Sequence, residues 1–363
     1  MKGLIYLDSV SFFLGANTPK GFYSLFNELY NPDEDWNMYI IKGGPGTGKS
    51  SIMKKITNEA EKNNLAVERV PCSSDPFSLD GVIIPDIKTA IADGTSPHVI
   101  NPIYPGVCEH IINLGSCWDK DKLKNNKSKI KKTTKINSDF HKQSIRFLKT
   151  AAVVDNEIKM MTDKYLKKDK AQRFIDRFCN NDLIKTDKDT GICKKRFLSA
   201  VTPIGITIQY DTLFKICDKI ISINDKTPLI SGYINSLINN IADKKGIDRI
   251  LCMCPLNPDE KIEHIIFPNI RLGIFTSNTY HPMIKKEMRN INSDRFINTS
   301  ATDDYKNKIT FLNKAKLEMI GESVRCLEQA KATHDLLESY YISAMDFGKV
   351  SSVTDNLIES IFR

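Results

Sequence analysis

Residues 43–50 have the types and spacing of a phosphate-binding loop. They run Gly-Gly-Pro-Gly-Thr-Gly-Lys-Ser and fit the pattern G-x-x-x-x-G-K-[ST]. Glycines let a backbone turn tightly around phosphate, and the positive end of a following helix attracts the anion. Lys49 can reach the β- and γ-phosphates, and the Ser50 hydroxyl can ligate Mg²⁺. The expected ligands are therefore ATP and Mg²⁺, held by Gly43, Gly44, Pro45, Gly46, Thr47, Gly48, Lys49, Ser50 and Ser51.

The sequence around this loop predicts the elements that would position it. Residues 38–41 are apolar and predict a buried strand, while residues 51–62 predict a helix with Ile52 and Ile56 on one face. Strand, glycine loop and helix thus occur in the order that a P-loop requires. Lys42 precedes the first glycine, so it lacks the position of the signature lysine in deviant Walker A partitioning ATPases. That subclass is disfavoured.

Two aspartates are candidates for catalysis. Asp93 ends an apolar segment, residues 89–93, where a Walker B carboxylate would hold Mg²⁺ together with Ser50. The alternative is that Asp93 caps a turn before Gly94. Asp75 follows a predicted strand over 65–70 and could bind Mg²⁺, orient water or hold an acceptor hydroxyl, although an Asx turn fits it equally well. The catalytic set predicted from the sequence is Lys49, Asp93 and Asp75.

The chain is similar to itself at a nearly constant offset, which indicates a duplication. Segments 38–76 and 220–258 match without gaps at an offset of 182, and the segment around Phe13 matches that around Phe197. In the second copy the eight loop positions become residues 225–232. Lys49 is replaced by Ser231 and Asp93 by Thr276. A proline, a β-branched residue and the negative Asp225 should prevent the amide cradle, so nucleotide binding is expected only in the first copy.

Other polar residues have weaker claims to a functional role. Lys20, which corresponds to Ile204 in the second copy, could touch phosphate or substrate, but an exposed loop lysine is favoured. His98 has the partner His281 in the altered copy, which favours a structural role, and Cys72 with Cys254 is assigned to the core in the same way. Residues 151–157 resemble a Walker B strand ending at Asp155, but their neighbours continue a helical pattern. Arg69, Arg196 and Arg271 are candidates for an arginine finger.

The predicted fold class is α/β, with two tandem P-loop NTPase-like three-layer units, each followed by long α-helices. The predicted divisions are a nucleotide-binding unit over 1–118, a basic loop and helical segment over 119–192, a degenerate P-loop-like unit over 193–282 and a C-terminal helical segment over 283–363. Apolar residues approximate helical spacing in both tails, whereas 119–135 and 180–192 are polar and predict loops.

Composition limits the classes of partner. The 363 residues are 41% hydrophobic and 26% charged, as in globular proteins, and nine scattered cysteines show no metal-ligand spacing. Residues 119–150 hold eleven Lys or Arg and three Asp, which matches the net charge of +8 for the chain. A solvated helix face is favoured there over nucleic-acid binding, because aromatic residues are not interleaved. Asp8 interrupts the apolar N-terminal run, and a cytoplasmic protein without membrane segments is expected.

The run CSSDPFSLDGVIIPDIKTAIADGTSPHVINPIYPGVCEHIINLGSCWD at 72–119, after GGPGTGKSS, resembles a family of bacterial P-loop proteins, chiefly from Firmicutes. Members are described as ATPases or nucleotide-kinase-like proteins. The resemblance covers the whole chain and implies a P-loop NTPase fold and ATP binding through Gly43, Gly48, Lys49 and Ser50. The altered loop at residues 225–232 departs from an arrangement with two ATP sites, one in each copy.

Three functions fit these features. The first is a Mg²⁺-dependent ATPase whose nucleotide state moves the helical tails, a protein partner or a second copy of the chain. The second is a small-molecule or nucleotide kinase, with Asp75 near the acceptor. The third is a nucleotide-gated binding module with little turnover. The ATPase is preferred, since the large helical segments could sense the γ-phosphate.

Overall fold

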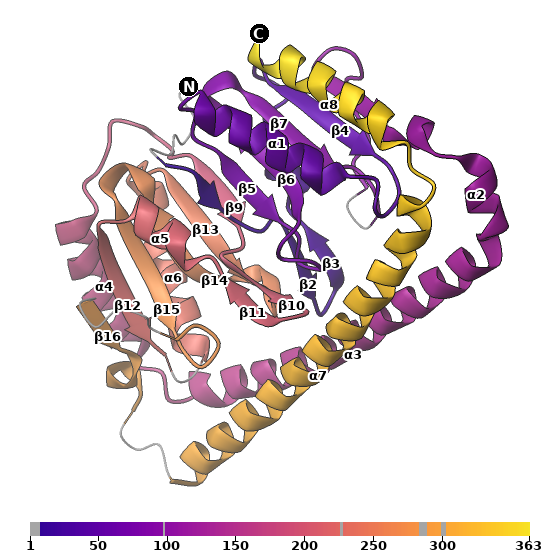
Figure 1. Cartoon of the computed structure of the whole chain (residues 1–363). Helices are drawn as coiled ribbons and strands as arrows, with labels where there is room; N and C mark the ends of the chain where they lie inside the picture. The colour runs from indigo at the N-terminus through magenta and orange to yellow at the C-terminus, as the bar shows by residue number, and fades with distance from the viewer. Residues whose placement is uncertain (1–7, 97–98, 226–227, 283–288, 299–302) are drawn as a thin grey trace.

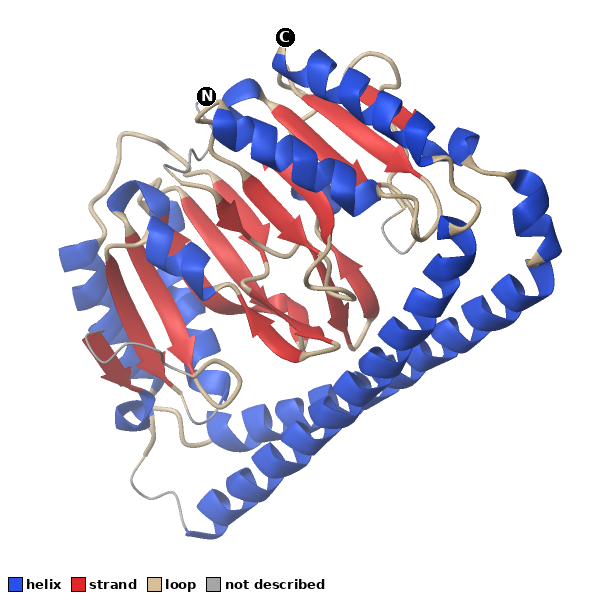
Figure 2. Cartoon of the chain, viewed as in Figure 1, coloured by secondary structure: helices blue, strands red, loops and turns tan. Residues whose placement is uncertain are grey.

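The computed structural model describes residues 8–96, 99–225, 228–282, 289–298 and 303–363. Within them the chain forms two α/β units joined by two long helices (Figures 1 and 2). Each unit contains a mixed six-stranded sheet flanked by helices, together with a small two-stranded hairpin. His98, discussed above, lies outside the described residues.

The first sheet has the strand order β1-β5-β6-β7-β4-β8. The β5–β6 and β6–β7 pairs are antiparallel and the other pairs are parallel. Its elements are β1 Val10–Ser11, β4 Asn37–Lys42, β5 Glu68–Pro71, β6 Leu79–Ile84, β7 Thr89–Asp93, β8 Glu109–Asn113, helix α1 Lys49–Lys62, and the hairpin β2 Gly15–Thr18 with β3 Gly21–Ser24. Short 3₁₀ helices cover Phe26–Glu28, Pro85–Ile87 and Leu114–Cys117.

The second sheet repeats the first strand for strand, as β9-β13-β14-β15-β12-β16 with the same pattern of parallel and antiparallel pairs. Its elements are β9 Cys193–Arg196, β12 Lys219–Asn224, β13 Arg249–Cys254, β14 Asn257–Phe267, β15 Leu272–Ser277, β16 Arg289–Asn292, helices α5 Tyr210–Ile216 and α6 Pro228–Lys244, and the hairpin β10 Ser199–Thr202 with β11 Gly205–Ile208. Short 3₁₀ helices cover Pro268–Ile270 and Ser293–Phe296. The two similar units confirm the duplication.

The two copies meet at equivalent residues. Phe13 and Phe197, which match in the sequence repeat, exchange two backbone hydrogen bonds of 2.9 Å. Both rings are fully buried, and they belong to a hydrophobic core that includes residues of both units. The duplicated halves are therefore packed into one body around an approximate two-fold relationship.

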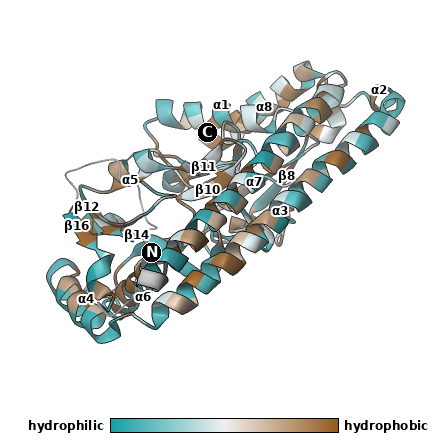
Figure 3. Cartoon of the chain, turned by 90° about the horizontal axis from the view of Figure 1, so that it is seen from below, coloured by the Kyte–Doolittle hydropathy of each residue, from teal (hydrophilic) through white to brown (hydrophobic). Residues whose placement is uncertain are grey.

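Two long helices, α3 (Lys127–Asp163) and α7 (Asp303–Ile342), run antiparallel along the same side of both units (Figure 1). Ser144 and Ser323 share a buried hydrogen bond of 2.7 Å near the middle of this helical pair, and the Asn137 side chain donates to the Ala330 carbonyl at 2.7 Å. Figure 3 shows hydrophobic and hydrophilic residues mixed along both helices, as expected for amphipathic helices that each bury one face.

The last helix of each half packs on the other half. Helix α4 (Lys168–Asp182) follows α3 but contacts α6 of the second unit, whereas the C-terminal α8 (Phe347–Phe362) contacts α1 of the first unit. Matching bridges hold both crossings, between Trp118 and Met345 and between Leu166 and Ile297. The units are thus tied together by exchanged helices.

One sequence-based expectation is wrong. Residues 119–135 are helical rather than a loop, because they form α2 (Lys120–Asn125) and the first turns of α3. The Asp119 side chain caps α2 by accepting hydrogen bonds of 3.1 Å from the amides of Asp121 and Lys122. Lysine favours helices at exposed positions, and packing on α7 gives the segment a partner. The segment after α4, by contrast, is mainly irregular as expected.

Among the described residues, no helix has the length and apolar character needed to span a bilayer.

Candidate functional site

The glycine loop lies between the end of β4 and the start of α1, as the sequence predicts. Gly46 and Gly48 have φ angles of +66° and +91°, which a side chain would strain, and α1 begins directly after Gly48. Thr47 Oγ1 donates to the Gly44 carbonyl at 2.9 Å and closes the loop on itself. The residues therefore adopt a compact turn at a helix N-terminus, the place where backbone amides can bind an anion.

The structure brings Lys49 and Asp93 together. Lys49 Nζ lies 3.5 Å from Asp93 Oδ2 and donates to the carbonyls of Gly44 at 2.7 Å and Gly43 at 3.2 Å. The side chains of Lys49 and Asp93 are only 11% and 15% exposed. This proximity follows from the sheet, because parallel strands β4 and β7 are neighbours and pair Ile41 with Asp93. The ammonium thus lies between the loop and the proposed metal-binding carboxylate.

Both interpretations of Asp93 are visible in its contacts. Oδ1 accepts hydrogen bonds from the amide and hydroxyl of Thr95, at 2.8 Å and 2.5 Å, and so caps a turn. Oδ2 points to Lys49. Ser50, the other expected metal ligand, accepts a 3.0 Å hydrogen bond from the Leu79 amide through Oγ. Asp93 thus ends β7, while Ser50 in α1 is hydrogen-bonded to the first residue of the neighbouring strand β6.

Asp75 and the lysines near the loop have other contacts. Asp75 accepts a 2.8 Å hydrogen bond from Ser78 and lies 3.7 Å from Lys331 of α7, and both of these contacts are directed away from Lys49. Lys20 pairs with Asp259 of the second unit. Lys42 donates to two backbone carbonyls, of Gly94 and Ile100. Asp75 and Lys20 thus link the first unit to other parts of the chain.

The last turn of α7 covers the loop, which the sequence did not predict. The Gly46 amide donates to Glu338 Oε1 at 3.1 Å. A Cβ atom placed on Gly44 would lie 2.9 Å from Tyr341, and one on Gly46 would lie 2.8 Å from Ile342. The Tyr341 ring also packs against Trp118, with 5.9 Å between ring centres. A side chain of this protein therefore occupies a backbone amide of the glycine loop.

Helix α8 packs on the same region. Val350 and Leu357 of α8 share a hydrophobic cluster with Ile52 and Ile56, the apolar face of α1 expected from the sequence. The helix that follows Lys49 is therefore buried by a segment about 300 positions later in the chain. A local sequence pattern shows that α1 has an apolar face but cannot show what covers it.

In the second unit a carboxylate lies near the start of α6. Asp225 is fully buried, and its Oδ2 accepts a 2.7 Å hydrogen bond from the Ser231 amide near the start of α6. Ser293 donates to the other oxygen of Asp225 at 3.3 Å. Lys226 and Thr227 lie outside the described residues. Asp225 thus accepts a hydrogen bond from an amide near the helix start, a more specific role than the repulsion expected from the sequence.

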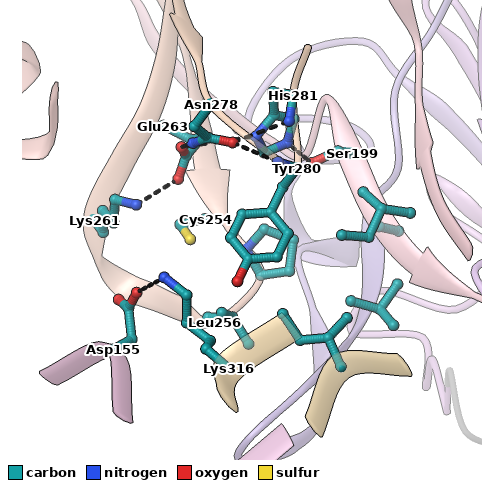
Figure 4. A pocket seen from close by; sticks show the side chains of 15 residues that line it. Asp155, Ser199, Cys254, Leu256, Lys261, Glu263, Asn278, Tyr280, His281 and Lys316 are labelled. Carbon is teal, nitrogen blue, oxygen red and sulfur yellow. Dashed lines mark hydrogen bonds and ion pairs between the residues drawn. The ribbon is translucent and has the colours of Figure 1, made fainter. Parts of the chain in front are cut away.

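A second polar cluster lies where the second unit meets α3 and α7 (Figure 4). It lines a cavity of about 40 Å³, large enough to hold water. Lys261 pairs with Glu263 at 2.8 Å, and Lys316 of α7 pairs with Asp155 of α3 at 2.6 Å. The two positive and two negative charges compensate one another. We assign this cluster to the attachment of α7 to the second unit.

Burial changes the acid–base properties of this cluster. Burial lowers the pKa of His281 to about 4, so the ring is neutral at pH 7. Burial would raise the pKa of Glu263, but the neighbouring Lys261 outweighs it and holds that pKa well below its usual range. Burial alone would lower the pKa of Lys261, but the neighbouring Cys254 and Glu263 outweigh burial and raise that pKa. Both members of the Lys261–Glu263 pair are therefore charged.

The remaining sequence candidates have structural roles in the described residues. Asp155 lies inside α3, so residues 151–157 are not a Walker B strand. Each candidate arginine finger is held in an ion pair: Arg69 with Glu61, Arg196 with Glu68, and Arg271 with Asp218. Arg196 is fully buried between the two units. The acidic partners in these three ion pairs all lie outside the glycine loop.

Comparison of the chain with protein-family models, with curated proteins and with solved structures finds no significant match. The resemblance to bacterial P-loop proteins therefore remains a prediction from the sequence.

Proposed function

We propose that the chain is a P-loop nucleoside triphosphatase that binds one MgATP in its first unit. The observation that carries the proposal is the position of Lys49, between the glycine loop and Asp93 at the ends of adjacent parallel strands. Two units of the P-loop NTPase type, the second with a degenerate loop, would then explain the duplication. The buried Asp225 in the second loop supports a single nucleotide site.

The residues of the first unit fit a triphosphate and its metal. The Gly46 amide already donates to a carboxylate, which supports binding of an anionic oxygen at this loop. Lys49 would neutralise phosphate charge, and Ser50 with Asp93 would hold Mg²⁺ directly or through water. The bound nucleotide would supply the phosphoryl group for transfer. Exclusion of bulk water by the packing of α8 on α1 would strengthen these electrostatic contacts.

Water is the proposed acceptor of the phosphoryl group. Asp75, the residue that would hold an acceptor hydroxyl in a kinase, contacts Ser78 and Lys331 rather than Lys49. This arrangement favours hydrolysis over transfer to a small molecule. Helix α7, whose last turn covers the loop, would respond to the nucleotide.

Product analysis with γ-labelled ATP tests the reaction. The purified chain should release labelled inorganic phosphate in the presence of Mg²⁺, with or without added cell metabolites. Label that appears in a small molecule would support the kinase alternative. Tight ATP binding with negligible turnover would support a nucleotide-gated binding module. Absence of ATP binding would contradict all three.

A further inference from the structure

The loop that would bind phosphate is already occupied from within the chain. The Glu338 carboxylate accepts a hydrogen bond from the Gly46 amide at 3.1 Å, across 292 residues of sequence. A negatively charged oxygen at this amide is what a nucleotide phosphate would supply. The carboxylate is therefore a chemical counterpart of the phosphate, delivered by the last turn of α7.

The same turn also blocks the loop by its volume. Ideal Cβ atoms on Gly44 and Gly46 would lie within 3 Å of Tyr341 and Ile342, so these side chains are in direct contact with the loop backbone. The Glu338 carbonyl lies 3.0 Å from the Cβ position of Gly46. A polyphosphate cannot lie across these glycines unless the turn moves away. Charge and shape thus act at the same place.

We propose that the C-terminal turn of α7 is an autoinhibitory gate that competes with nucleotide for the phosphate loop. The inference rests on the proposed ATP site and adds its regulation. Nucleotide binding would displace Glu338, Tyr341 and Ile342 together, because they belong to one helical turn. The gate also explains how occupancy of the site reaches the rest of the protein.

Helix α7 connects the gate to the second unit. Lys316 is only 1% exposed and is held by Asp155, and its ammonium lies 5.1 Å from the ring centre of Tyr280 (Figure 4). From Lys316 to Glu338 is a separation of 22 residues, roughly 33 Å along a helix. The helix is thus anchored at one unit while its end covers the loop of the other. Movement of its last turn would strain or tilt the α3–α7 pair.

The segment after the gate is fixed to the first unit. The Asp119 amide donates to the Ala344 carbonyl at 2.8 Å, and the Asp346 amide donates to the Cys117 carbonyl at 2.9 Å. These bonds place a joint between α7 and α8, so the gate can open while α8 remains on α1. The opening would be a local hinge movement beside Trp118.

The other half of the duplication does not repeat the negative charge. Met345 bridges to Trp118, and Leu166 makes the equivalent bridge to Ile297. Glu338 lies seven residues before Met345. The residue seven positions before Leu166 is Lys159, so Lys159 is the counterpart of Glu338. The degenerate loop instead contains its own buried Asp225. The position of α3 that is equivalent to Glu338 is therefore a lysine, and the altered loop carries its own carboxylate instead.

Removing the gate should tighten nucleotide binding. A competing closed state lowers apparent affinity by the fraction of molecules that are open. Glu338→Gln keeps the size of the side chain and removes its charge, so it should bind MgATP at least about fivefold more tightly than the parent. A Glu338→Ala/Tyr341→Ala double variant should bind still more tightly. Glu322→Gln, on the surface of the same helix where Glu322 pairs with Arg325, is the matched control and should leave affinity unchanged.

Trp118 provides a direct optical probe of the gate. The chain contains two tryptophans, so Trp36→Phe isolates the fluorescence of Trp118, which packs on Tyr341. Titration with MgATP, or with tripolyphosphate, should change this fluorescence in the Trp36→Phe background, and Glu338→Gln should move the midpoint to lower ligand concentration. If the parent and the Glu338 variants all bind ATP with equal titration midpoints, the gate is overturned, whereas the proposed ATP site stands. A failure of the parent and of both Glu338 variants to bind MgATP would instead overturn the proposed function, and the gate with it.

Discussion

Lys49 Nζ lies 3.5 Å from the Asp93 carboxylate, and Ser231 and Thr276 occupy the two equivalent positions of the second unit. The duplicated sheets have the same strand order and direction, so the structural framework is preserved where both charges are absent. The framework therefore does not require a lysine and an aspartate at these positions. Their presence together in one unit supports a chemical role there.

Replacement of Asp93 by Asn should impair Mg²⁺-dependent hydrolysis more than ATP binding. The amide keeps the size of the side chain and can still contact Thr95, but it loses the charge that would hold the metal. We expect at least a tenfold loss of turnover with a smaller change in affinity. Turnover and affinity are measured on the same preparations. Thr276→Ser, at the equivalent strand position, is the control and should leave turnover unchanged. Equal losses of binding and turnover in Asp93→Asn would indicate a role in folding of the turn.

Replacement of Lys316 by Met should destabilise the protein. The change keeps a long side chain but removes the ammonium that neutralises Asp155, whose carboxylate would remain largely buried at 17% exposure. Loss of one member of such a pair costs several kcal/mol, and with this partial exposure we expect about 2–3 kcal/mol. Urea unfolding measures the difference. Arg325→Met, which breaks a pair between exposed residues of the same helix, should cost less than about 1 kcal/mol.

Mild acid should also destabilise the second unit through His281. Burial depresses its pKa to about 4 in the folded protein, whereas an unfolded histidine titrates near 6.5. The unfolded chain therefore binds more protons between these values, so the stabilisation is complete above pH 6.5 and falls as the pH falls towards 4. From pH 7.5 to pH 5.0 this histidine alone accounts for about 2 kcal/mol of lost stability.

Urea unfolding at the two pH values measures this dependence. His281→Gln should weaken it without abolishing it, because burial also lowers the pKa of the neighbouring His264. His110→Gln, a change at a partly exposed ring that stacks on Tyr39, is the control and should retain the dependence of the parent. An unchanged dependence in His281→Gln would show that other groups cause it.

The sequence predicts those parts of the site that are local in the chain. The strand, glycine loop and helix around Lys49 are set by hydrophobic periodicity and by glycines at positive φ. Asp93 could be found because the duplication offers an internal comparison with Thr276. The comparison also gives the strand correspondence between the two units, which the sheets confirm.

The cover over the loop could not be predicted in the same way. Glu338 and Tyr341 have ordinary positions on a long amphipathic helix, and nothing local distinguishes them from other surface residues. Their role depends on the exchange of α4 and α8 between the two halves, which is a tertiary arrangement. Arg196 is a similar case, because its burial beside Glu68 depends on the contact between the two units. The polar, lysine-rich composition of residues 119–135 predicts a loop, whereas the helix that forms there is stabilised by packing on α7.

Calorimetric titration of the chain with MgATP tests the central claim most directly. The account predicts one nucleotide per chain and a loss of about 2–4 kcal/mol of binding free energy in Lys49→Ala, the scale of one charge-assisted contact to a buried anion. Ser231→Ala, at the equivalent position of the second unit, should leave the titration unchanged. Two nucleotides per chain, or an affinity that Lys49→Ala does not alter, would contradict it.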